Sequence, residues 1–518
     1  MMRLSALAVV GGLLAGCGGP TEQFTIASGS ENRILEPIVQ DFCKAQRIAC
    51  KFEYMGSLDI GLAVADNSGD FDAVWPANGI WIDLFDRQKR VRDLTPIARS
   101  PVLLGVRKGK AQELGWIGRD VSSSDIVDAV RDKKLTFLAS SATQSNSGAG
   151  AYIAMLSAAL GHPDAITQAD LERPDVRDKV RTLLSGISRT AGSSGWLADL
   201  YLKGIEQGVH YDAMWNYEAV LAETNETLRQ RGAELLYAIY PSDGVALANS
   251  PLGFVDRGRG PTVRTFFEAL QKHLLSAEIQ KRLVQSFRRP AVGEATGAKP
   301  DPSWNYDPNR LVTLVRMPEP AVVRTALELY QDALRRPSLT VYCLDFSGSM
   351  QGKGEQSLQA AMHFILSRDQ SAPLLVQHAQ SDQIVVIPFD AGVRRVIRGT
   401  GSTADQARLL EAVAHERAGG GTDIYACAGR GLQEIAATAG WQNFLPAIVV
   451  MTDGKSEDHL QSFLARWREA KNEIPVFGIT FGDADASQLE RLAEATRARV
   501  FDGTKSLTEA FRTVRGYN

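Results

Sequence analysis

Short apolar runs alternate with segments of helical periodicity along nearly the whole chain, and this alternation restricts its fold more than any other feature. Apolar runs bounded by polar turns are typical of buried strands, whereas apolar residues at helical spacing are typical of amphipathic helices. Strands that alternate with helices form layered structures with mostly parallel sheets. The sequence therefore predicts an α/β protein, and its 518 residues are enough for two to four domains at about 150 residues each.

The predicted strands fall into two groups. The first group comprises residues 24–27, 50–54, 71–75, 102–107, 135–139, 213–216 and 234–240, and the second comprises 339–344, 384–389, 447–451 and 475–481. Between the groups, residues 290–308 are rich in Pro and Gly and poor in aliphatic side chains, which is typical of a linker. We predict two domains, over residues 21–310 and 336–518, joined by a linker and a helix at 311–335.

The first seventeen residues predict export. Arg3 precedes the apolar run Leu4–Leu14, which is too short to span about 30 Å of hydrocarbon and is typical of a signal peptide. The run ends in Leu-Ala-Gly-Cys at 14–17, which resembles the lipobox of bacterial lipoproteins. The resemblance implies that residues 1–16 are a removable signal peptide and that Cys17 is lipidated. We expect an extracytoplasmic protein held to the membrane by its lipid, facing the periplasm in a Gram-negative cell, with the choice of membrane left open.

Charge and motif content exclude several functions. The 57 basic and 60 acidic residues give a formal net charge of -3 without a long run of one sign, so no nucleic-acid-binding surface is expected. The sequence has no zinc-protease motif, no nucleophile elbow, no phosphate-binding loop and no dinucleotide fingerprint. No motif surrounds its seven histidines, so no general base can be assigned. We expect a protein that is not an enzyme.

The four cysteines after Cys17 form two pairs by context. Cys43 and Cys50 lie seven residues apart, at the end of a predicted helix and the start of a predicted strand, where either a disulfide or two thiols are compatible with export. Cys343 and Cys427 lie in apolar surroundings, and we expect both to be free, buried thiols.

Oxygen donors follow two buried strands of the second predicted domain. The apolar run at 339–344 ends directly in Asp-Phe-Ser-Gly-Ser at 345–349, and the strand at 447–451 is followed by Asp453. A Gly-rich segment at 419–421 leads to Thr422. Loops at the carboxyl ends of parallel strands line the edge where α/β sheets bind ligands. Carboxylates and hydroxyls without imidazole or thiolate favour a hard cation such as Mg²⁺ or Mn²⁺.

These motifs resemble the von Willebrand factor type A (VWA) family, and the resemblance covers residues 335–518. Taken alone, Asp-x-Ser-x-Ser also fits a strand-to-helix turn with capping residues, but the three parts occur in the order of the family's metal-ion-dependent adhesion site. The resemblance implies a doubly wound, Rossmann-like parallel sheet and a cation that holds a carboxylate of a protein partner. The implied cation site consists of Asp345, Ser347, Ser349, Thr422 and Asp453. Asp423 is expected to begin a helix and Met350 to pack in the core.

Two loops of the first predicted domain are rich in Ser and Gly and precede helices. They lie at 28–31 and at 140–148, and Tyr217 follows a third strand. Hydroxyls and free backbone N–H groups at the start of a helix can bind an anion, and they also serve as ordinary caps and turns. The sequence leaves both alternatives open.

The layout of this domain resembles the type II periplasmic solute-binding proteins, a class that includes molybdate and sulfate binders. The resemblance implies two lobes, with the second lobe at about 108–245, and two crossings between them at 99–107 and 250–255. A solute between the lobes would contact Ser28, Ser30, Ser57, Ser145, Ser147 and Tyr217. We expect Trp75, Trp81, Trp196 and Trp215 to pack in the core or between the lobes rather than stack on a sugar.

The combined features predict a membrane-tethered binding protein. In this hypothesis the VWA domain binds a protein partner through a cation, and the two-lobed domain binds a small solute or a segment of the partner. The alternative is a transport receptor that delivers an oxyanion or a small organic ligand to an ABC permease. A third interpretation, a chaperone for an AAA+ ATPase, is disfavoured because the signal peptide separates the chain from ATP.

Overall fold

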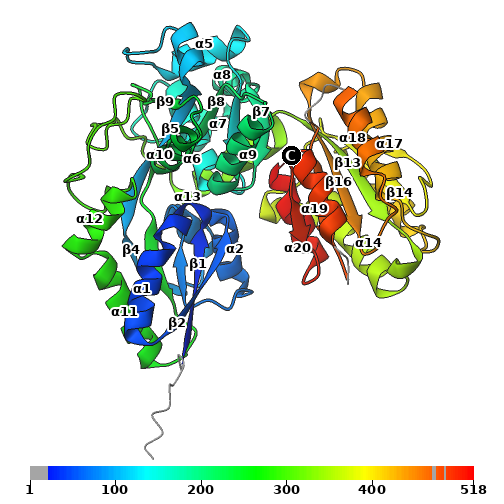
Figure 1. The fold of residues 1–518 in the computed structure, drawn as a ribbon, viewed down its shortest axis with the longest axis horizontal. Helices are drawn as coiled ribbons and strands as arrows, with labels where there is room; N and C mark the ends of the chain where they lie inside the picture. Colours follow the sequence, from blue (N-terminus) through cyan, green and yellow to red (C-terminus); the bar gives the residue numbers. More distant parts are fainter. Residues whose placement is uncertain (1–21, 470–473, 483–485, 518) are drawn as a thin grey trace, which may run out of the picture.

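The computed structural model describes residues 22–469, 474–482 and 486–517 and consists of three α/β units (Figure 1). The predicted leader, with Cys17, lies outside the described residues. Each unit is built around its own sheet, and the order of strands in these sheets is β2-β1-β3-β11-β4, then β10-β5-β8-β6-β7 with β9 and β12 also paired to β5, then β15-β14-β13-β16-β17-β18. The predicted α/β class is confirmed, and we call the units the first lobe, the second lobe and the C-terminal domain.

The first lobe combines two separate stretches of the chain. Its strands are β1 (Gln23–Gly29), β2 (Ala49–Met55), β3 (Ala73–Trp75), β4 (Val91–Pro96) and β11 (Pro251–Val255). Its helices are α1 (Glu36–Gln46), α2 (Ser57–Asp66), α3 (Ile80–Phe85), α11 (Pro261–Leu274) and α12 (Ala277–Gln285). A 3₁₀ turn at Ser30–Leu35 follows β1. Strand β11 pairs antiparallel with β3 and β4, so the returning chain completes this sheet.

Most of the second lobe lies between these stretches, and β12 joins it after α12. Its strands are β5 (Ala98–Arg107), β6 (Phe137–Ser140), β7 (Ile187–Ala191), β8 (Ala213–Tyr217), β9 (Leu236–Ile239), β10 (Leu247–Ala248) and β12 (Arg289–Pro290). Its helices are α4 (Lys108–Glu113), α5 (Ser123–Arg131), α6 (Asn146–Ala159), α7 (Gln168–Glu172), α8 (Pro174–Leu184), α9 (Ser194–Glu206) and α10 (Glu218–Gln230).

The two connections between the lobes differ slightly from the expected crossings. All of β5 pairs within the second sheet, and β11 pairs within the first. In these two connections the chain passes between the sheets at Ile97 and at Asn249 and Ser250, and it returns to the second lobe once more after α12, since β12 pairs with β5. The two expected crossing segments are strands that begin just after these points rather than strands that span both lobes.

The Pro- and Gly-rich segment after β12 packs against the second lobe. The Ala238 N–H of β9 donates to the Trp304 carbonyl at 2.8 Å, and the rings of Trp304 and Tyr306 stack with centroids 4.7 Å apart. Arg289, at the start of the segment, forms a 2.7 Å ion pair with the fully buried Glu218. These contacts attach the segment to the second lobe.

The C-terminal domain is a parallel sheet with one antiparallel edge strand. Helix α13 (Pro320–Leu329) and a π-helical turn (Tyr330–Leu334) lead into it. Its strands are β13 (Ser338–Asp345), β14 (Gln383–Phe389), β15 (Ile397–Thr400), β16 (Leu445–Thr452), β17 (Val476–Thr480) and β18 (Val500–Asp502), of which β15 is antiparallel to β14. Its helices are α14 (Lys353–Leu366), α15 (Arg368–Ser371), α16 (Thr403–Ala414), α17 (Ile424–Ala437), α18 (Leu460–Glu469), α19 (Ala486–Ala495) and α20 (Leu507–Val514).

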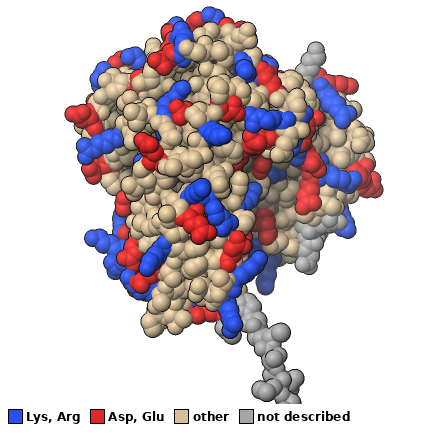
Figure 2. Space-filling model, turned by 60° about the vertical axis from the view of Figure 1, so that its left-hand side comes forward, with Lys and Arg blue, Asp and Glu red and all other residues tan. Residues whose placement is uncertain are grey.

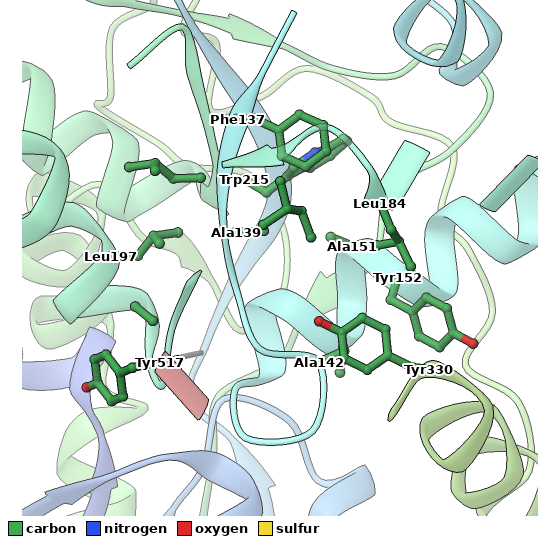
Figure 3. Close-up of a cluster of buried hydrophobic side chains, with 14 of the residues drawn as sticks. Phe137, Ala139, Ala142, Ala151, Tyr152, Leu184, Leu197, Trp215, Tyr330 and Tyr517 are labelled. Atoms are coloured by element: carbon green, nitrogen blue, oxygen red, sulfur yellow. The ribbon is translucent and has the colours of Figure 1, made fainter. Parts of the chain in front are cut away.

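The hydrophobic core of the second lobe continues into the C-terminal part of the chain. Tyr152 of α6 lies against Tyr330, with ring centroids 5.2 Å apart, and its hydroxyl donates to the Ala326 carbonyl of α13 at 2.9 Å. Figure 3 shows Tyr330 beside Tyr152, and Tyr517 in the same cluster as Leu197 of α9. The C-terminal domain is thus packed directly on the second lobe.

Two disulfides join the four described cysteines. Cys43 and Cys50 are bonded, with Cα atoms 6.0 Å apart, so the structure has the bridged form of the two alternatives that the sequence left open. The expectation for the other pair was wrong, because Cys343 of β13 and Cys427 of α17 are also bonded, with Cα atoms 5.9 Å apart. Helix α17 packs across β13, which brings together two apolar segments that are 84 residues apart in the sequence.

Candidate metal site and solute cleft

The expected cation ligands meet at the carboxyl end of the C-terminal sheet. Asp345 ends β13 and is fully buried, and its Oδ1 accepts a hydrogen bond from the Ser347 N–H at 2.7 Å. The Ser347 and Ser349 hydroxyls are 3.1 Å apart, and the Ser349 hydroxyl donates to Asp453 Oδ1 at 2.6 Å. Two strand-end loops that are more than a hundred residues apart in the sequence therefore place their oxygens side by side.

The Gly-rich loop is fixed against the loop that follows β13. The Gly348 N–H donates to the Gly420 carbonyl at 2.9 Å, and the Gly419 N–H donates to the Phe346 carbonyl at 2.8 Å. These bonds bring Thr422 to the cluster: a Cβ atom on Gly454 would lie 2.9 Å from Thr422 Oγ1 and 3.6 Å from Ser349 Oγ. A side chain at position 454 would crowd the oxygens, and glycine leaves room for them.

Burial and mutual repulsion shape the electrostatics of this cluster. Desolvation raises the pKa of Asp345 above its ordinary value, hydrogen bonds from Thr452 and Ser347 lower it, and the negative charge of Asp453 raises it. Thr452 donates from its hydroxyl to Asp345 Oδ2. None of the described Lys, Arg or His residues forms an ion pair with either aspartate within 4 Å. Two carboxylates thus belong to one partly desolvated cluster, and the nearby Arg394 guanidinium donates to the Phe346 and Gly419 carbonyls of the surrounding loops.

The donor set fits a small, hard cation. The Ser349 hydroxyl lies 3.1 Å from the Ser347 hydroxyl and 2.6 Å from Asp453 Oδ1, and adjacent ligands of an octahedral Mg²⁺ ion are about 3 Å apart. The described residues contain no group of three or more His, Cys, Asp and Glu side chains suited to a metal, so hydroxyls are a necessary part of any site here. Asp423 caps α17 by accepting from the Ala426 N–H at 2.9 Å, and Met350 is fully buried, as expected for both.

The second candidate site is the cleft between the two lobes, which is nearly closed. The Ser30 hydroxyl of the first lobe accepts from the Gly195 N–H of α9 at 3.2 Å, and the Trp81 indole donates to Asn146 Oδ1 at 2.9 Å. A Cβ atom on Gly56 would overlap the Gln144 carbonyl. The cavity that remains deep between the lobes, beside Asn32 and Tyr217, measures about 20 Å³.

The predicted solute contacts are buried in the cleft or beside it. On the second lobe, the Ser145 and Ser147 hydroxyls lie 3.1 Å from each other, and the Tyr217 hydroxyl accepts from Asn146 Nδ2 at 3.1 Å. On the first lobe, Ser28 accepts from Asn32 at 3.3 Å and Ser57 accepts from the Ala77 N–H at 3.0 Å. Ser28, Ser57, Ser145 and Ser147 thus form hydrogen bonds within their own lobes, whereas Ser30 bonds across the cleft and Tyr217 lines the small cavity between the lobes.

Glu31 belongs to the loop at 28–31, and its carboxyl group lies at the start of helix α9 of the other lobe. Its Oε2 lies 3.5 Å from the Ser194 hydroxyl at the start of α9, and its Oε1 is buried without a hydrogen-bond partner. Desolvation raises the pKa of Glu31 to about 7. Arg288 donates to the Glu31 backbone carbonyl and pairs with Glu223, so its guanidinium lowers this pKa only through space.

Sequence reasoning missed Glu31 and Ser193 as features of the cleft. Ser193, the N-cap of α9, is 6% exposed, and its hydroxyl has no hydrogen-bond partner. Strand β7, which leads to Ser193, has the short polar sequence Ile-Ser-Arg-Thr-Ala and lacks the apolar run that would have revealed it. Glu31 lies in a loop that the sequence predicted, but its burial depends on contact with α9, whose Ser194 is 163 residues away in the sequence. Of the four tryptophans for which we expected packing in the core or between the lobes, Trp75, Trp81 and Trp215 are buried, and Trp196 is partly exposed.

The surface carries both signs of charge. Figure 2 shows Lys and Arg interspersed with Asp and Glu over one face of the molecule, without an extended patch of one sign. Among the described residues, no helix is long and apolar enough to cross a membrane.

Comparisons with known proteins find two family matches, one over the two lobes and one over the C-terminal domain. A family model described as bacterial extracellular solute-binding protein matches residues 24–289, and the von Willebrand factor type A domain model matches residues 341–513. A search of curated proteins finds no match.

Solved structures resemble separate parts of the chain. Iron-bound HitA from Pseudomonas aeruginosa is 14% identical with a TM-score of 0.43, and the match covers 59% of this chain and 97% of that protein. AfuA from Actinobacillus pleuropneumoniae, with fructose-6-phosphate bound, is 13% identical with a TM-score of 0.41, covering 56% and 92%. A von Willebrand factor type A protein from Catenulispora acidiphila is 20% identical with a TM-score of 0.30, covering 36% and 43%. By its family matches, the chain belongs to the bacterial extracellular solute-binding proteins and carries a VWA domain at its C-terminal end.

Proposed function

We propose that this protein is an extracytoplasmic binding protein whose VWA domain holds an acidic side chain of a protein partner through Mg²⁺ or Mn²⁺. The observation that supports the proposal best is the convergence of two loops, in which the Ser349 hydroxyl lies 3.1 Å from the Ser347 hydroxyl and 2.6 Å from Asp453 Oδ1, and Asp345 accepts from the Ser347 N–H. Thr422 and Ser347 complete an all-oxygen set. A solute-binding domain beside a VWA domain supports a binding role rather than catalysis.

The hydroxyls and the carboxylates of such a site have different roles. Hydroxyls are neutral donors, so Ser347, Ser349 and Thr422 hold a cation without cancelling its charge. Asp345 and Asp453 supply two negative charges, and Thr452 and the Ser347 N–H hold Asp345 in place through hydrogen bonds. A bound divalent cation would supply Lewis acidity toward one incoming carboxylate. The site is therefore suited to binding an Asp or Glu side chain of another protein.

Thermal unfolding of the full mature chain tests the cation site. Binding to the native state raises the melting temperature, so Mg²⁺ should raise that of the wild type and have no effect on Asp345→Asn. Asp369→Asn, which removes an exposed acid of α15 in the same domain, is the matched control and should respond like the wild type. An equal response of wild type and Asp345→Asn to Mg²⁺ and Mn²⁺ would show that the cation does not bind here.

The family match supports a second candidate function, a receptor that delivers a small solute to an ABC permease. Above about pH 7, where Glu31 is ionised, its buried carboxylate opposes an oxyanion at its position, since two negative charges would share a desolvated site. It favours a solute that donates hydrogen bonds or carries a positive charge. A thermal-shift screen with molybdate, tungstate, sulfate, phosphate, amines and neutral organic compounds distinguishes these solute classes.

The lipidated N-terminus belongs to the same proposal. Cleavage before Cys17 and acylation of its amino group and thiol would tether the binding protein to the membrane surface. Mass spectrometry of the mature protein from a bacterial membrane fraction tests this step: the N-terminal peptide should begin at Cys17 and carry acyl chains, and an unmodified peptide would contradict it.

A further inference from the structure

One residue of the C-terminal helix contacts both lobes of the solute-binding domain. Arg512 Nη1 of α20 lies 2.6 Å from Asp59 Oδ1 of α2 in the first lobe. The Arg512 carbonyl accepts a hydrogen bond from Gln144 Nε2 of the second lobe at 3.0 Å. The Arg512 side chain is 6% exposed and Asp59 is 16% exposed, so water screens the ion pair only in part. Helix α20 therefore bridges the mouth of the cleft.

The C-terminal domain is fixed mainly to the second lobe. Arg336, which precedes β13, donates to the Ile187 carbonyl of β7 at 3.0 Å, and Arg189 of β7 donates to the Arg497 carbonyl at 2.8 Å. Near the C-terminus, a Cβ atom on Gly192 would lie 2.7 Å from the Tyr517 ring. Because these contacts all involve the second lobe, the C-terminal domain and the second lobe form one unit. A movement of the first lobe relative to this unit would separate Asp59 from Arg512.

A cavity of about 420 Å³ lies beneath α20, where the two lobes and the VWA domain meet. Its walls include Tyr54 of the first lobe, Trp196 of the second lobe and Arg499 of the VWA domain. The Arg499 guanidinium stacks on the Trp196 ring at 3.6 Å from its centroid. The unpartnered Ser193 hydroxyl belongs to the same lining. The volume is in the range of small-molecule sites, roughly 300–1,000 Å³.

We infer that the VWA domain forms the third wall of the solute site, so that α20 must release Asp59 before the cleft can open and exchange its solute. The inference rests on the proposed solute-binding role of the first two lobes. It explains why the cleft is closed at its base, at about 20 Å³, whereas the larger cavity lies beneath the VWA domain. A ligand in this chamber would contact all three units, and its binding would change how firmly the VWA domain is held.

The lining indicates the class of ligand. The acidic side chains Glu53, Asp59, Asp66 and Glu509 line the chamber together with the basic side chains of Arg499 and Arg512. Asp59 and Glu509 both pair with Arg512, so the remaining charge of the lining does not favour an anion. Partly exposed Trp196 and Tyr54 add apolar surface to the lining, with Arg499 stacked on Trp196 and Arg33 over both rings, and Ser193 and Gln144 offer polar groups. The chamber is suited to a neutral or cationic organic molecule rather than to an inorganic oxyanion.

Cysteine labelling tests the gate without knowledge of the solute. In the full chain with Cys17→Ser, the four described native cysteines are held in disulfides, and Ser193→Cys would place one thiol on the chamber wall. We expect Asp59→Asn to raise the rate of maleimide labelling at position 193 by about tenfold or more, the change that corresponds to ~1.4 kcal/mol. Asp70→Asn, which neutralises an exposed acid of the same lobe, should leave the rate unchanged, and Asp59→Glu should restore slow labelling.

Hydrogen exchange provides a second readout that needs no introduced cysteine. Asp59→Asn should speed amide exchange in α20 and in the loop around Gln144, but not in β13 or β16 at the centre of the VWA sheet. Labelling and exchange rates that match the wild type in Asp59→Asn would overturn the inference. Neither measurement contains a divalent cation or a partner, so failure here leaves the cation-site experiment as an independent test of the proposed function.

Discussion

Arg512 Nη1 of the VWA domain and Asp59 Oδ1 of the first lobe lie 2.6 Å apart, although the two residues are separated by 453 positions in the sequence. The pair is the point at which a module with a cation site meets a module with a solute cleft. Because both side chains are mostly buried, either partner left alone would be a poorly solvated charge. The relationship therefore makes the stability of the two modules interdependent.

A double-mutant cycle on this pair should reveal the coupling. We expect Asp59→Ala and Arg512→Ala each to lower the free energy of unfolding, and the double variant to lower it by less than the sum, with a coupling of ~1–3 kcal/mol. Urea unfolding followed by tryptophan fluorescence provides the measurement. Strictly additive effects would mean that the pair does not connect the domains.

The absence of a side chain at Gly454 provides a test of the cation site that leaves every donor intact. Gly454→Ala would put a Cβ atom 2.9 Å from Thr422 Oγ1, so we expect Mg²⁺ affinity to fall by about tenfold or more, ~1.4 kcal/mol. Gly392→Ala is the matched control, because a Cβ atom there has no neighbour within 4 Å. Isothermal titration with Mg²⁺ on both variants and the wild type gives the comparison, and equal affinities for all three would place the cation elsewhere.

The sequence predicted most of the structure that carries the sites, because buried strands have continuous apolar runs. The strand that ends at Asp345 and the strand before Asp453 were both predicted, and so the convergence of their loops could be foreseen. Several edge strands were missed, although β2 was predicted: β4, β7, β15 and β18 are short or polar and lack such runs. The bond between Cys343 and Cys427 depends on the packing of α17 across β13, which no local pattern shows. The docking of α20 at Asp59 is likewise a tertiary property.

Glu31 should make the protein less stable as the pH rises toward neutrality. Its pKa is raised to about 7 in the folded chain from an ordinary value of 4.5, so between these values the folded state holds a proton that the unfolded state releases. This contribution is fully present below pH 4.5 and is lost as the pH rises through 7, by up to ~3 kcal/mol. Glu31→Gln should remove this part of the pH dependence in urea unfolding.

The same variant bears on the solute. With the internal carboxylate neutralised, the start of α9 and the Ser193 and Ser194 hydroxyls become free to receive an anion. Above pH 7, where Glu31 of the wild type is ionised, we expect sulfate to raise the melting temperature of Glu31→Gln and not that of the wild type. A clear response of the wild type to sulfate or molybdate would favour the oxyanion receptor instead.

His378 should act in the opposite direction at acid pH. It is buried beside Asp382, Arg335, Arg515 and Tyr342, and burial lowers its pKa to about 4. In the unfolded state His378 is protonated near pH 6.5, whereas in the folded state it stays neutral until about pH 4. The free energy of unfolding is therefore lowered as the pH falls from 6.5 to 4, by up to ~3 kcal/mol. His378→Gln should be less sensitive to acid than the wild type in this interval. The pKa of Asp382 is held far below its usual range, chiefly by Arg335 against its burial, so Asp382 stays charged throughout.

The Cys343–Cys427 disulfide should stabilise the VWA domain, since it closes an 84-residue loop between β13 and α17. Constraint of the unfolded chain by a loop of this size contributes about 4 kcal/mol in the chain-entropy account. We expect Cys343→Ser with Cys427→Ser to lower the melting temperature, whereas Cys43→Ser with Cys50→Ser, which opens a seven-residue loop in the first lobe, should have the smaller effect.

Alkylation of the unfolded, unreduced chain followed by mass spectrometry checks both bridges, and alkylated Cys343 and Cys427 would show that they are free thiols after all. Cys343 and Asp345 both lie on β13, and Cys427 lies in the first turn of α17, which Asp423 caps. Loss of the bridge should therefore also weaken Mg²⁺ binding, because it would loosen the loops that hold the oxygen donors.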